Sequence, residues 1–192
     1  LMDEYRKLLG PKTKLVSIVH ASNVLGTVNP VKQIIELAHK TGAVVLVDGA
    51  QSTVHMDIDV QEMDCDFFAF SAHKIYGPTG AGVLYGKKEI LGAMPPFMGG
   101  GEMIKEVTFA RTTYNDLPYK FEAGTPNIAD VIAFKTALQF MQETGKEKIR
   151  KHEHELLLYA TDRLEQIPGL RIIGQAGEKV SVISFVIDKA HQ

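Results

Sequence analysis

The amino-acid sequence predicts an α/β fold in which helices flank a mostly parallel sheet. An apolar run over 14–20 is followed by a helical pattern over 29–42 and by a second apolar run over 43–50. The helical pattern has Pro30 near its start and Gly42 at its end, the asymmetry that helices prefer. A strand, a helix and a strand in this order form a crossover unit, and such units join parallel strands.

Two further apolar segments, 65–72 and 82–86, extend the predicted sheet. The run over 43–50 is continuously apolar, as expected for a parallel strand that is covered on both faces. The segment 92–126 is rich in glycine and proline and is too long for an ordinary connection. We interpret it as a functional excursion from the fold.

The last part of the chain has a different pattern. From about 127 to 166 the sequence is helical in two stretches, and short strands are expected in "LRIIG" and "SVISFVI". We therefore expect a large domain over 1–147 and the start of a small α+β domain over 148–192.

Composition and charge exclude several classes of protein. The 192 residues carry a net charge of −2 without a long basic cluster, which argues against nucleic-acid binding and against an anionic membrane surface. The longest apolar runs have strand length, so no membrane-spanning segment is predicted. The single cysteine, Cys65, excludes an internal disulfide and a cysteine-rich metal centre, and no metal is expected. It fits a reducing, cytoplasmic location, and no targeting signal is visible.

Polar side chains follow three of the predicted strands. In open α/β sheets the ligand crevice lies beyond the carboxyl ends of the strands, so these residues are expected to converge on one edge. They are His20, Ser22 and Asn23 after the first strand, Asp48 and Gln51 after the second, and Ser71, His73 and Lys74 after the third.

This set of residues matches the needs of pyridoxal 5'-phosphate. That cofactor requires a lysine amine for an imine, an acid facing its pyridine nitrogen, donors for its phosphate and a polar partner for its ring hydroxyl. Lys74 would be the amine and Asp48 the acid. Ser71 and His73 would donate to the phosphate, together with backbone amides of the glycine-rich turn that follows. Taken singly, such residues are more often surface or turn residues, so the prediction rests on their joint occurrence.

Five blocks of sequence together resemble one enzyme group. They are "SNVLGT" (22–27), "DGAQ" (48–51), "DCDFFAFSAHKIYGPTGAGVLYG" (64–86), "GGGEMI" (99–104) and "FEAGTPN" (121–127). In these blocks the chain resembles the class V aminotransferase group of fold-type I pyridoxal phosphate enzymes. It is most similar to the Suf-type (group II) cysteine desulfurases and the related selenocysteine lyases. The resemblance implies an incomplete fold-type I large domain followed by the start of the small domain.

The resemblance also implies roles for individual residues. It assigns Lys74 as the lysine of the imine, Asp48 as the partner of the pyridine nitrogen, Asn23 and Gln51 as neighbours of the ring hydroxyl, and Ser71 and His73 as phosphate ligands. Thr125 resembles the residue that reaches the phosphate of the neighbouring subunit, which implies a homodimer with its site at the interface. "GGGEMI" would lie near the entrance of the site, and no chemistry is assigned to it.

The implied reaction is the conversion of L-cysteine to L-alanine, with sulfur passing as a persulfide to a sulfur-acceptor protein of iron–sulfur cluster assembly. The family's persulfide-forming cysteine, its substrate-binding arginine and its ring-stacking histidine lie in segments that this chain does not contain. Cys65 matches a buried position of the family and is expected to behave as a small hydrophobe. The chain as given is therefore not expected to complete a turnover. A selenocysteine lyase, an aminotransferase and a non-catalytic interaction fragment remain alternatives.

Overall fold

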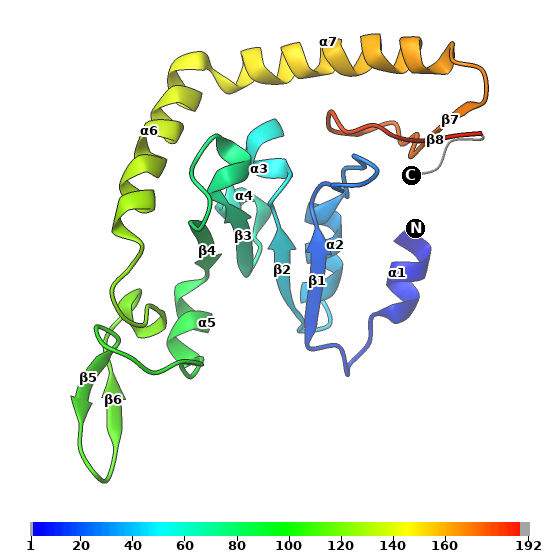
Figure 1. The fold of residues 1–192 in the computed structure, drawn as a ribbon. Coiled ribbons are helices and arrows are strands. Elements are labelled where there is room, and N and C mark those ends of the chain that lie inside the picture. Colours follow the sequence, from blue (N-terminus) through cyan, green and yellow to red (C-terminus); the bar gives the residue numbers. More distant parts are fainter. Residues whose placement is uncertain (1, 189–192) are drawn as a thin grey trace.

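The computed structural model describes residues 2–188, and a four-stranded mixed sheet lies at its centre (Figure 1). The strands follow the order β1 (Leu15–Val19), β2 (Val44–Asp48), β3 (Phe67–Ser71) and β4 (Gly82–Gly86). β1, β2 and β3 are parallel, whereas β4 runs antiparallel to β3. The predicted α/β architecture with a mostly parallel sheet is confirmed.

Short helices connect these strands. They are α1 (Met2–Leu8) before β1, α2 (Val31–His39) between β1 and β2, α3 (Ser52–His55) and α4 (Val60–Met63) between β2 and β3, and α5 (Lys88–Ala93) after β4. Helix α2 is the predicted crossover helix. It is shorter than the predicted span because Pro30 precedes it as the N-cap and because the chain turns at Gly42, whose φ is +75°.

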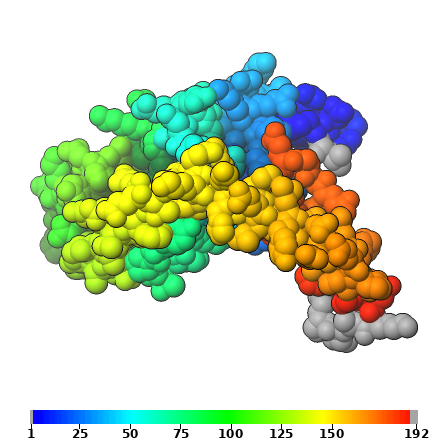
Figure 2. Space-filling view, turned by 90° about the horizontal axis from the view of Figure 1, so that it is seen from above, coloured from blue at the N-terminus to red at the C-terminus, as the bar shows by residue number. Residues whose placement is uncertain are grey.

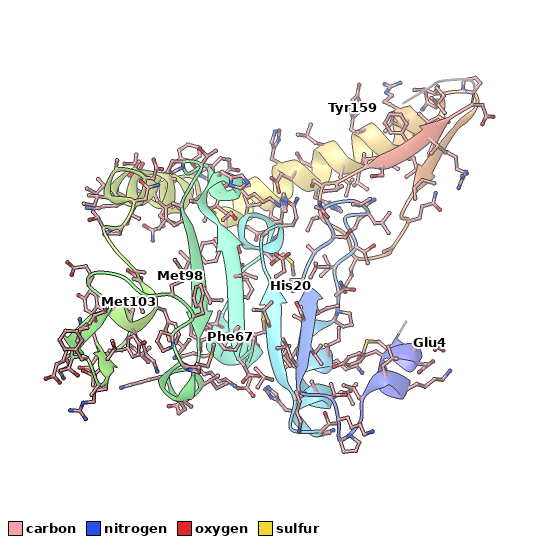
Figure 3. All side chains as sticks on the ribbon, turned by 60° about the horizontal axis from the view of Figure 1, so that its bottom comes forward. Glu4, His20, Phe67, Met98, Met103 and Tyr159 are labelled. Atoms are coloured by element: carbon pink, nitrogen blue, oxygen red, sulfur yellow. The ribbon has the colours of Figure 1, made fainter. Side chains whose placement is uncertain are left out.

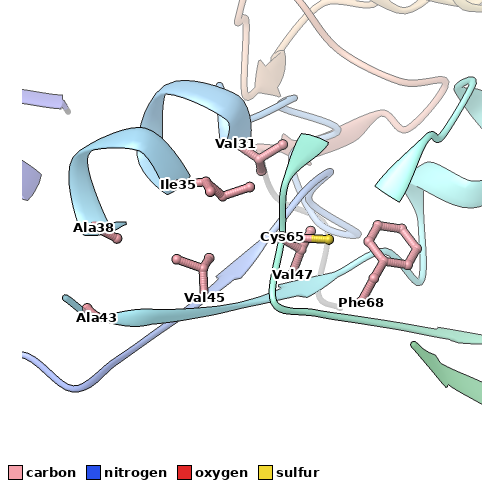
Figure 4. Close-up of a cluster of buried hydrophobic side chains, with 8 residues drawn as sticks. All are labelled: Val31, Ile35, Ala38, Ala43, Val45, Val47, Cys65 and Phe68. Atoms are coloured by element: carbon pink, nitrogen blue, oxygen red, sulfur yellow. The ribbon is translucent and has the colours of Figure 1, made fainter. Parts of the chain in front are cut away.

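The main core lies between α2 and one face of the sheet (Figure 4). Side chains one turn apart on α2 pack on Val45 and Val47 of β2, and Cys65 and Phe68 complete the cluster. Along β2, buried positions alternate with half-buried ones. The expectation that this strand is covered on both faces is therefore wrong for the described residues 2–188, since the helices of the main core pack on one face only.

The opposite face of the sheet is largely open. It carries Leu15, Val19 and Leu84, which are 59%, 40% and 58% exposed. Apolar character on both faces of a strand thus does not by itself produce burial on both faces, because burial also requires a second layer of structure.

The segment 92–126 forms an excursion, as predicted. It contains the hairpin of β5 (Ile104–Val107) and β6 (Thr112–Tyr114) and the short 3-10 helix η2 (Tyr119–Phe121). Figure 1 shows the hairpin extending away from the sheet. Phe109, at its tip, is fully exposed.

Two long helices follow, α6 (Ile128–Thr144) and α7 (Lys146–Glu165), and then the antiparallel strands β7 (Leu170–Ile173) and β8 (Ser184–Ile187). The helices are separated at Gly145, whose φ is +85°, so the two predicted helical stretches are present. Figure 2 shows α7 crossing the molecule toward the two C-terminal strands. Among residues 2–188, no helix has both the length and the apolar character needed to cross a membrane.

A second core joins α6 to the sheet. Phe134, Ala137 and Met141 of α6 pack against Val54 of α3 and against the 3-10 helix η1 (Ala72–Ile75), which follows β3 directly. Ala72 and Ile75 are fully buried in this cluster. The end of β3 is thereby held against α6.

Candidate functional site

Asp48 lies at the edge where the three parallel strands end. It is the last residue of β2 and is in register with Val19 of β1 and Ala69 of β3. Its carbonyl oxygen accepts a hydrogen bond from the backbone N–H of His20 (2.8 Å), and the N–H of the next residue, Gly49, donates to the carbonyl of Ala69 (2.8 Å). The backbone around Asp48 is thus fixed between the two neighbouring strands.

The Asp48 side chain is half-buried, and its Oδ1 accepts a hydrogen bond from the N–H of Ala50 (2.9 Å). Within residues 2–188 this is its one hydrogen bond to protein, so the second carboxylate oxygen is available to a ligand. A carboxylate held in this way can face a protonated ring nitrogen.

Ser71, His73 and Lys74 lie at the same edge. Ser71 ends β3 in register with Gly82, and the other two belong to η1. The N–H of Ala72 donates to the carbonyl of Ala81 (3.0 Å), which closes the glycine-rich turn over η1. Lys74 is half-buried, and its amine makes no hydrogen bond or ion pair within the described part of the chain. An amine without a partner is what imine formation requires.

The turn after β1 places Asn23 at an exposed position. Ser22, which precedes it, accepts hydrogen bonds at Oγ from the N–H groups of Val24 (3.2 Å) and Leu25 (3.0 Å). Ser22 therefore stabilises the turn. Gln51 is the half-buried N-cap residue of α3, three positions after Asp48.

Thr125 lies in a different part of the structure. It is exposed in the loop between η2 and α6, next to Gly124 with φ +82°. Asn127 links this loop to the glycine-rich turn after Lys74 through a hydrogen bond from Nδ2 to the carbonyl of Gly80 (3.4 Å). The N–H of Gly124 donates to the carbonyl of Gly101 (2.9 Å), so "GGGEMI" and "FEAGTPN" lie side by side.

Two residues near this edge have features that the sequence did not indicate. His20, just beyond β1 (Figure 3), is only 5% exposed, and its Nδ1 has no partner within residues 2–188. Burial lowers the pKa of His20, so its imidazole is neutral at physiological pH. Gly49 leaves room for a ring, because a Cβ at this position would lie 1.9 Å from Cζ of Phe68.

Cys65 is completely buried in the main core. Burial raises the pKa of its thiol to about 11, so the reactive thiolate is scarce at neutral pH. The expectation that Cys65 is a small hydrophobic core residue is confirmed.

This burial predicts the reactivity of the thiol. In the folded chain, a disulfide reagent at about pH 8 should modify almost no Cys65, and one thiol per chain should react after unfolding in guanidinium chloride. The measurement is absorbance of the released chromophore. Full modification before unfolding would show that the core opens readily or that the thiol is accessible.

The donors at this edge fit pyridoxal phosphate. An unpartnered amine, a carboxylate with a free oxygen, a hydroxyl and an imidazole all follow neighbouring strands that end at the same place. The structure thus brings together Asp48, Ser71, His73 and Lys74. Asn23 and Gln51 lie on the segments that follow β1 and β2, and Thr125 is on the separate loop.

Relatives of known sequence were compared with the chain. A cysteine desulfurase of Synechococcus elongatus is 56% identical over 187 residues, which are 97% of this chain and 30% of that protein. A probable cysteine desulfurase of Halalkalibacterium halodurans is 52% identical over 190 residues, 99% of this chain and 47% of that protein. The chain thus spans about half of these relatives or less.

Solved structures of such enzymes have the same fold as this chain. The cysteine desulfurase CsdA of Escherichia coli superposes with a TM-score of 0.93 at 42% identity, over 98% of this chain and 47% of that one. A C-DES mutant with glycine covalently linked to its PLP cofactor has a TM-score of 0.84 at 27% identity, over 95% and 49%. The family described as aminotransferase class-V matches residues 1–192. The chain belongs to the class-V aminotransferase family.

Proposed function

We propose that the chain is the central cofactor-binding portion of a pyridoxal phosphate-dependent cysteine desulfurase. One observation carries the proposal. Asp48 ends β2, and the segment with Lys74 directly follows β3, which is the parallel neighbour of β2. A backbone hydrogen bond from the N–H of Gly49 to the carbonyl of Ala69 joins these two strands at this edge. Relatives named cysteine desulfurase at 46–57% identity support the choice of this reaction within the family.

When bound, pyridoxal phosphate supplies an electron sink for bond breaking at the α-carbon of an amino acid. Asp48 holds a proton at the pyridine nitrogen, because its backbone is fixed and one carboxylate oxygen is free. Ser71 and His73 donate hydrogen bonds to the phosphate. Asn23 and Gln51 orient the ring through its hydroxyl group.

Lys74 has two tasks. Its amine would hold the cofactor through a covalent bond, and the same amine, when free, would move the proton at the substrate α-carbon. Neither task is possible for an amine held in an ion pair, and Lys74 has no such pair in the described part of the chain.

The substrate is L-cysteine. A cysteine thiolate from a segment that this chain does not contain attacks the substrate sulfur and forms the S–S bond of an enzyme persulfide. The carbon–sulfur bond breaks, and the substrate carbon keeps its electron pair and takes up a proton, which gives L-alanine. Cys65 does not serve as that thiolate, because it is buried with a raised pKa. The persulfide sulfur then passes to an acceptor protein of iron–sulfur cluster assembly.

The protein acts as a cytoplasmic homodimer in this proposal. Thr125 is exposed and lies on a loop separate from the Asp48 edge, which supports a role at the phosphate of the neighbouring subunit. The exposed apolar face of α6, with Val131 and Ile132 at 57% and 66% exposure, also supports association through this part of the molecule.

The test is to trap the cofactor on the chain completed with the flanking segments of the Halalkalibacterium halodurans relative. After incubation with pyridoxal phosphate and borohydride reduction, peptide mass mapping should locate the adduct on Lys74. Lys74→Ala should lose the near-visible absorbance and the adduct, whereas Lys88→Ala, with its exposed side chain, should keep both.

The reaction product separates the alternatives within the family. L-Alanine and a persulfide formed from L-cysteine support a desulfurase. A keto acid identifies an aminotransferase, and activity on selenocysteine alone identifies a selenocysteine lyase. An adduct on a lysine other than Lys74, or none, would refute the site assignment.

A further inference from the structure

A side-chain contact joins α7 to the segment that follows β2. Nδ1 of His55 lies 2.7 Å from Oε2 of Glu153, across 98 residues of sequence. Both side chains are largely removed from solvent, with 15% and 24% exposed. His55 is the last residue of α3, the helix that begins directly after Gln51. This hydrogen bond therefore ties α7 to the helix that continues the Asp48–Gln51 segment.

Tyr76 joins the segment that carries Lys74 to α6. Tyr76 caps η1 in a left-handed conformation with φ +64°, two positions after Lys74. Its ring packs edge-on against Phe140 of α6, with centroids 5.4 Å apart. Tyr76 thus packs η1 against α6.

Apolar packing connects α3 to η1, so the hydrogen bond that holds α3 also affects η1. Val54 of α3 and Ala72 and Ile75 of η1 belong to one buried cluster with residues of α6. Close-packed interiors transmit displacements instead of absorbing them. A shift of α3, which Glu153 of α7 holds through His55, would therefore also displace η1.

We propose that Glu153 is a positioning residue that holds the Asp48–Gln51 segment and the His73–Lys74 segment in a fixed relation. The proposal rests on the proposed function, because it assumes that one cofactor contacts both segments. A ligand that bridges two segments binds more tightly when both are already in place, and Glu153 supplies that order through His55 and α3.

The test compares cofactor affinity with stability in the flank-completed protein. Glu153→Ala should raise the Kd for pyridoxal phosphate about tenfold, measured from the near-visible absorbance. Glu153→Gln keeps an oxygen that can accept a hydrogen bond from His55, so most of the affinity should return. In a His55→Ala background, Glu153→Ala should have much less effect, because the two residues share one interaction.

Leu157→Ala is the matched control. Leu157 lies one turn along α7 and is 8% exposed, so its truncation should lower the thermal midpoint at least as much as Glu153→Ala does. It should nevertheless leave the Kd within about twofold of the parent. If Leu157→Ala weakens cofactor binding as strongly as Glu153→Ala, Glu153 is merely structural. An unchanged Kd in Glu153→Ala would also overturn the proposal.

Hydrogen exchange of the cofactor-free protein provides a second readout. Glu153→Ala should speed exchange at the amides of Gly49 and Ala72, which are hydrogen-bonded across the site edge, whereas Leu157→Ala should speed exchange mainly along α7. Unchanged exchange at both amides would overturn the positioning role. Absence of a Lys74 adduct in the parent would refute the proposed function but not the positioning role of Glu153. Hydrogen exchange is measured without the cofactor, so it still decides whether Glu153 orders both segments.

Discussion

Substitution of Gly49 by alanine is expected to destabilise the chain by about 3 kcal/mol or more, because the new methyl group would occupy the position of a buried ring. The added Cβ would lie 1.9 Å from Cζ and 2.3 Å from Cε1 of Phe68. Phe68 is 2% exposed and packs in the main core, so its ring has little space into which to move. Such a loss is a large part of the 5–15 kcal/mol that stabilises a typical domain.

The same substitution should affect the site. Gly49 directly follows Asp48, and its N–H donates to Ala69, so a displaced backbone would move the carboxylate away from the Lys74 segment. The expected result is a lower urea midpoint together with loss of the pyridoxal phosphate adduct on Lys74.

A second substitution tests the cause. Phe68→Leu removes the ring atoms that the methyl group would meet, so Gly49→Ala should cost less in that background than alone. Gly92→Ala is the control, since no atom lies within 4 Å of a Cβ there and the residue is in helix α5. It should be neutral or slightly stabilising. Equal costs for Gly49→Ala with and without the Phe68 ring would contradict the steric explanation.

The central sheet could be predicted because its signals are local. Apolar runs of strand length are separated by a helical pattern, whose start follows from Pro30 and which is followed by the turn at Gly42. The polar residues at the strand ends were also visible, since the carboxyl ends of parallel strands meet at one edge. Asp48 and Lys74 could therefore be placed together before the structure was known.

Other features depend on contacts that sequence patterns do not contain. The exposed face of the sheet reflects a missing second layer within residues 2–188, which an apolar run cannot reveal. The close approach of Phe68 to Gly49 follows from register and side-chain direction. The hydrogen bond between His55 and Glu153 spans 98 residues, so neither residue carries a local signal of its partner.

At the opposite edge of the sheet, Asp66→Asn is expected to cost about 3 kcal/mol at neutral pH. Asp66 is 5% exposed, and its Oδ2 accepts a hydrogen bond from the N–H of Val45 (2.7 Å) and lies 2.8 Å from Nε2 of His39. Its Oδ1 lies 3.1 Å from Nζ of Lys87. The carboxylate thus joins α2, β2 and the end of β4, and its loss leaves buried partners unsatisfied.

The same network predicts how stability depends on pH. Burial alone would raise the pKa of Asp66, but hydrogen bonds from His39, Val45 and Lys87 outweigh burial and hold the pKa below its usual value. A carboxyl group whose pKa is lowered by folding stabilises the fold above its unfolded pKa, about 3.9 for aspartate. That contribution is lost as the pH falls through the lower value of the folded state. Urea unfolding between about pH 5 and pH 2 should therefore show a steep loss in the parent chain and a shallower one in Asp66→Asn.

Asp64 provides the matched comparison, because it contacts the same two side chains, Lys87 and His39. Its carboxylate lies 2.6 Å from Nζ of Lys87 and 3.4 Å from Nδ1 of His39, but its side chain is 63% exposed. Asparagine also tolerates the left-handed backbone at this position, where φ is +59°. Asp64→Asn should therefore cost less than about 1 kcal/mol. If the two substitutions lower the free energy of unfolding equally, the pairing with Lys87 and His39 would determine the loss, and the burial of Asp66 would not. If the stability of Asp66→Asn falls with decreasing pH as steeply as that of the parent, a group other than Asp66 causes the loss.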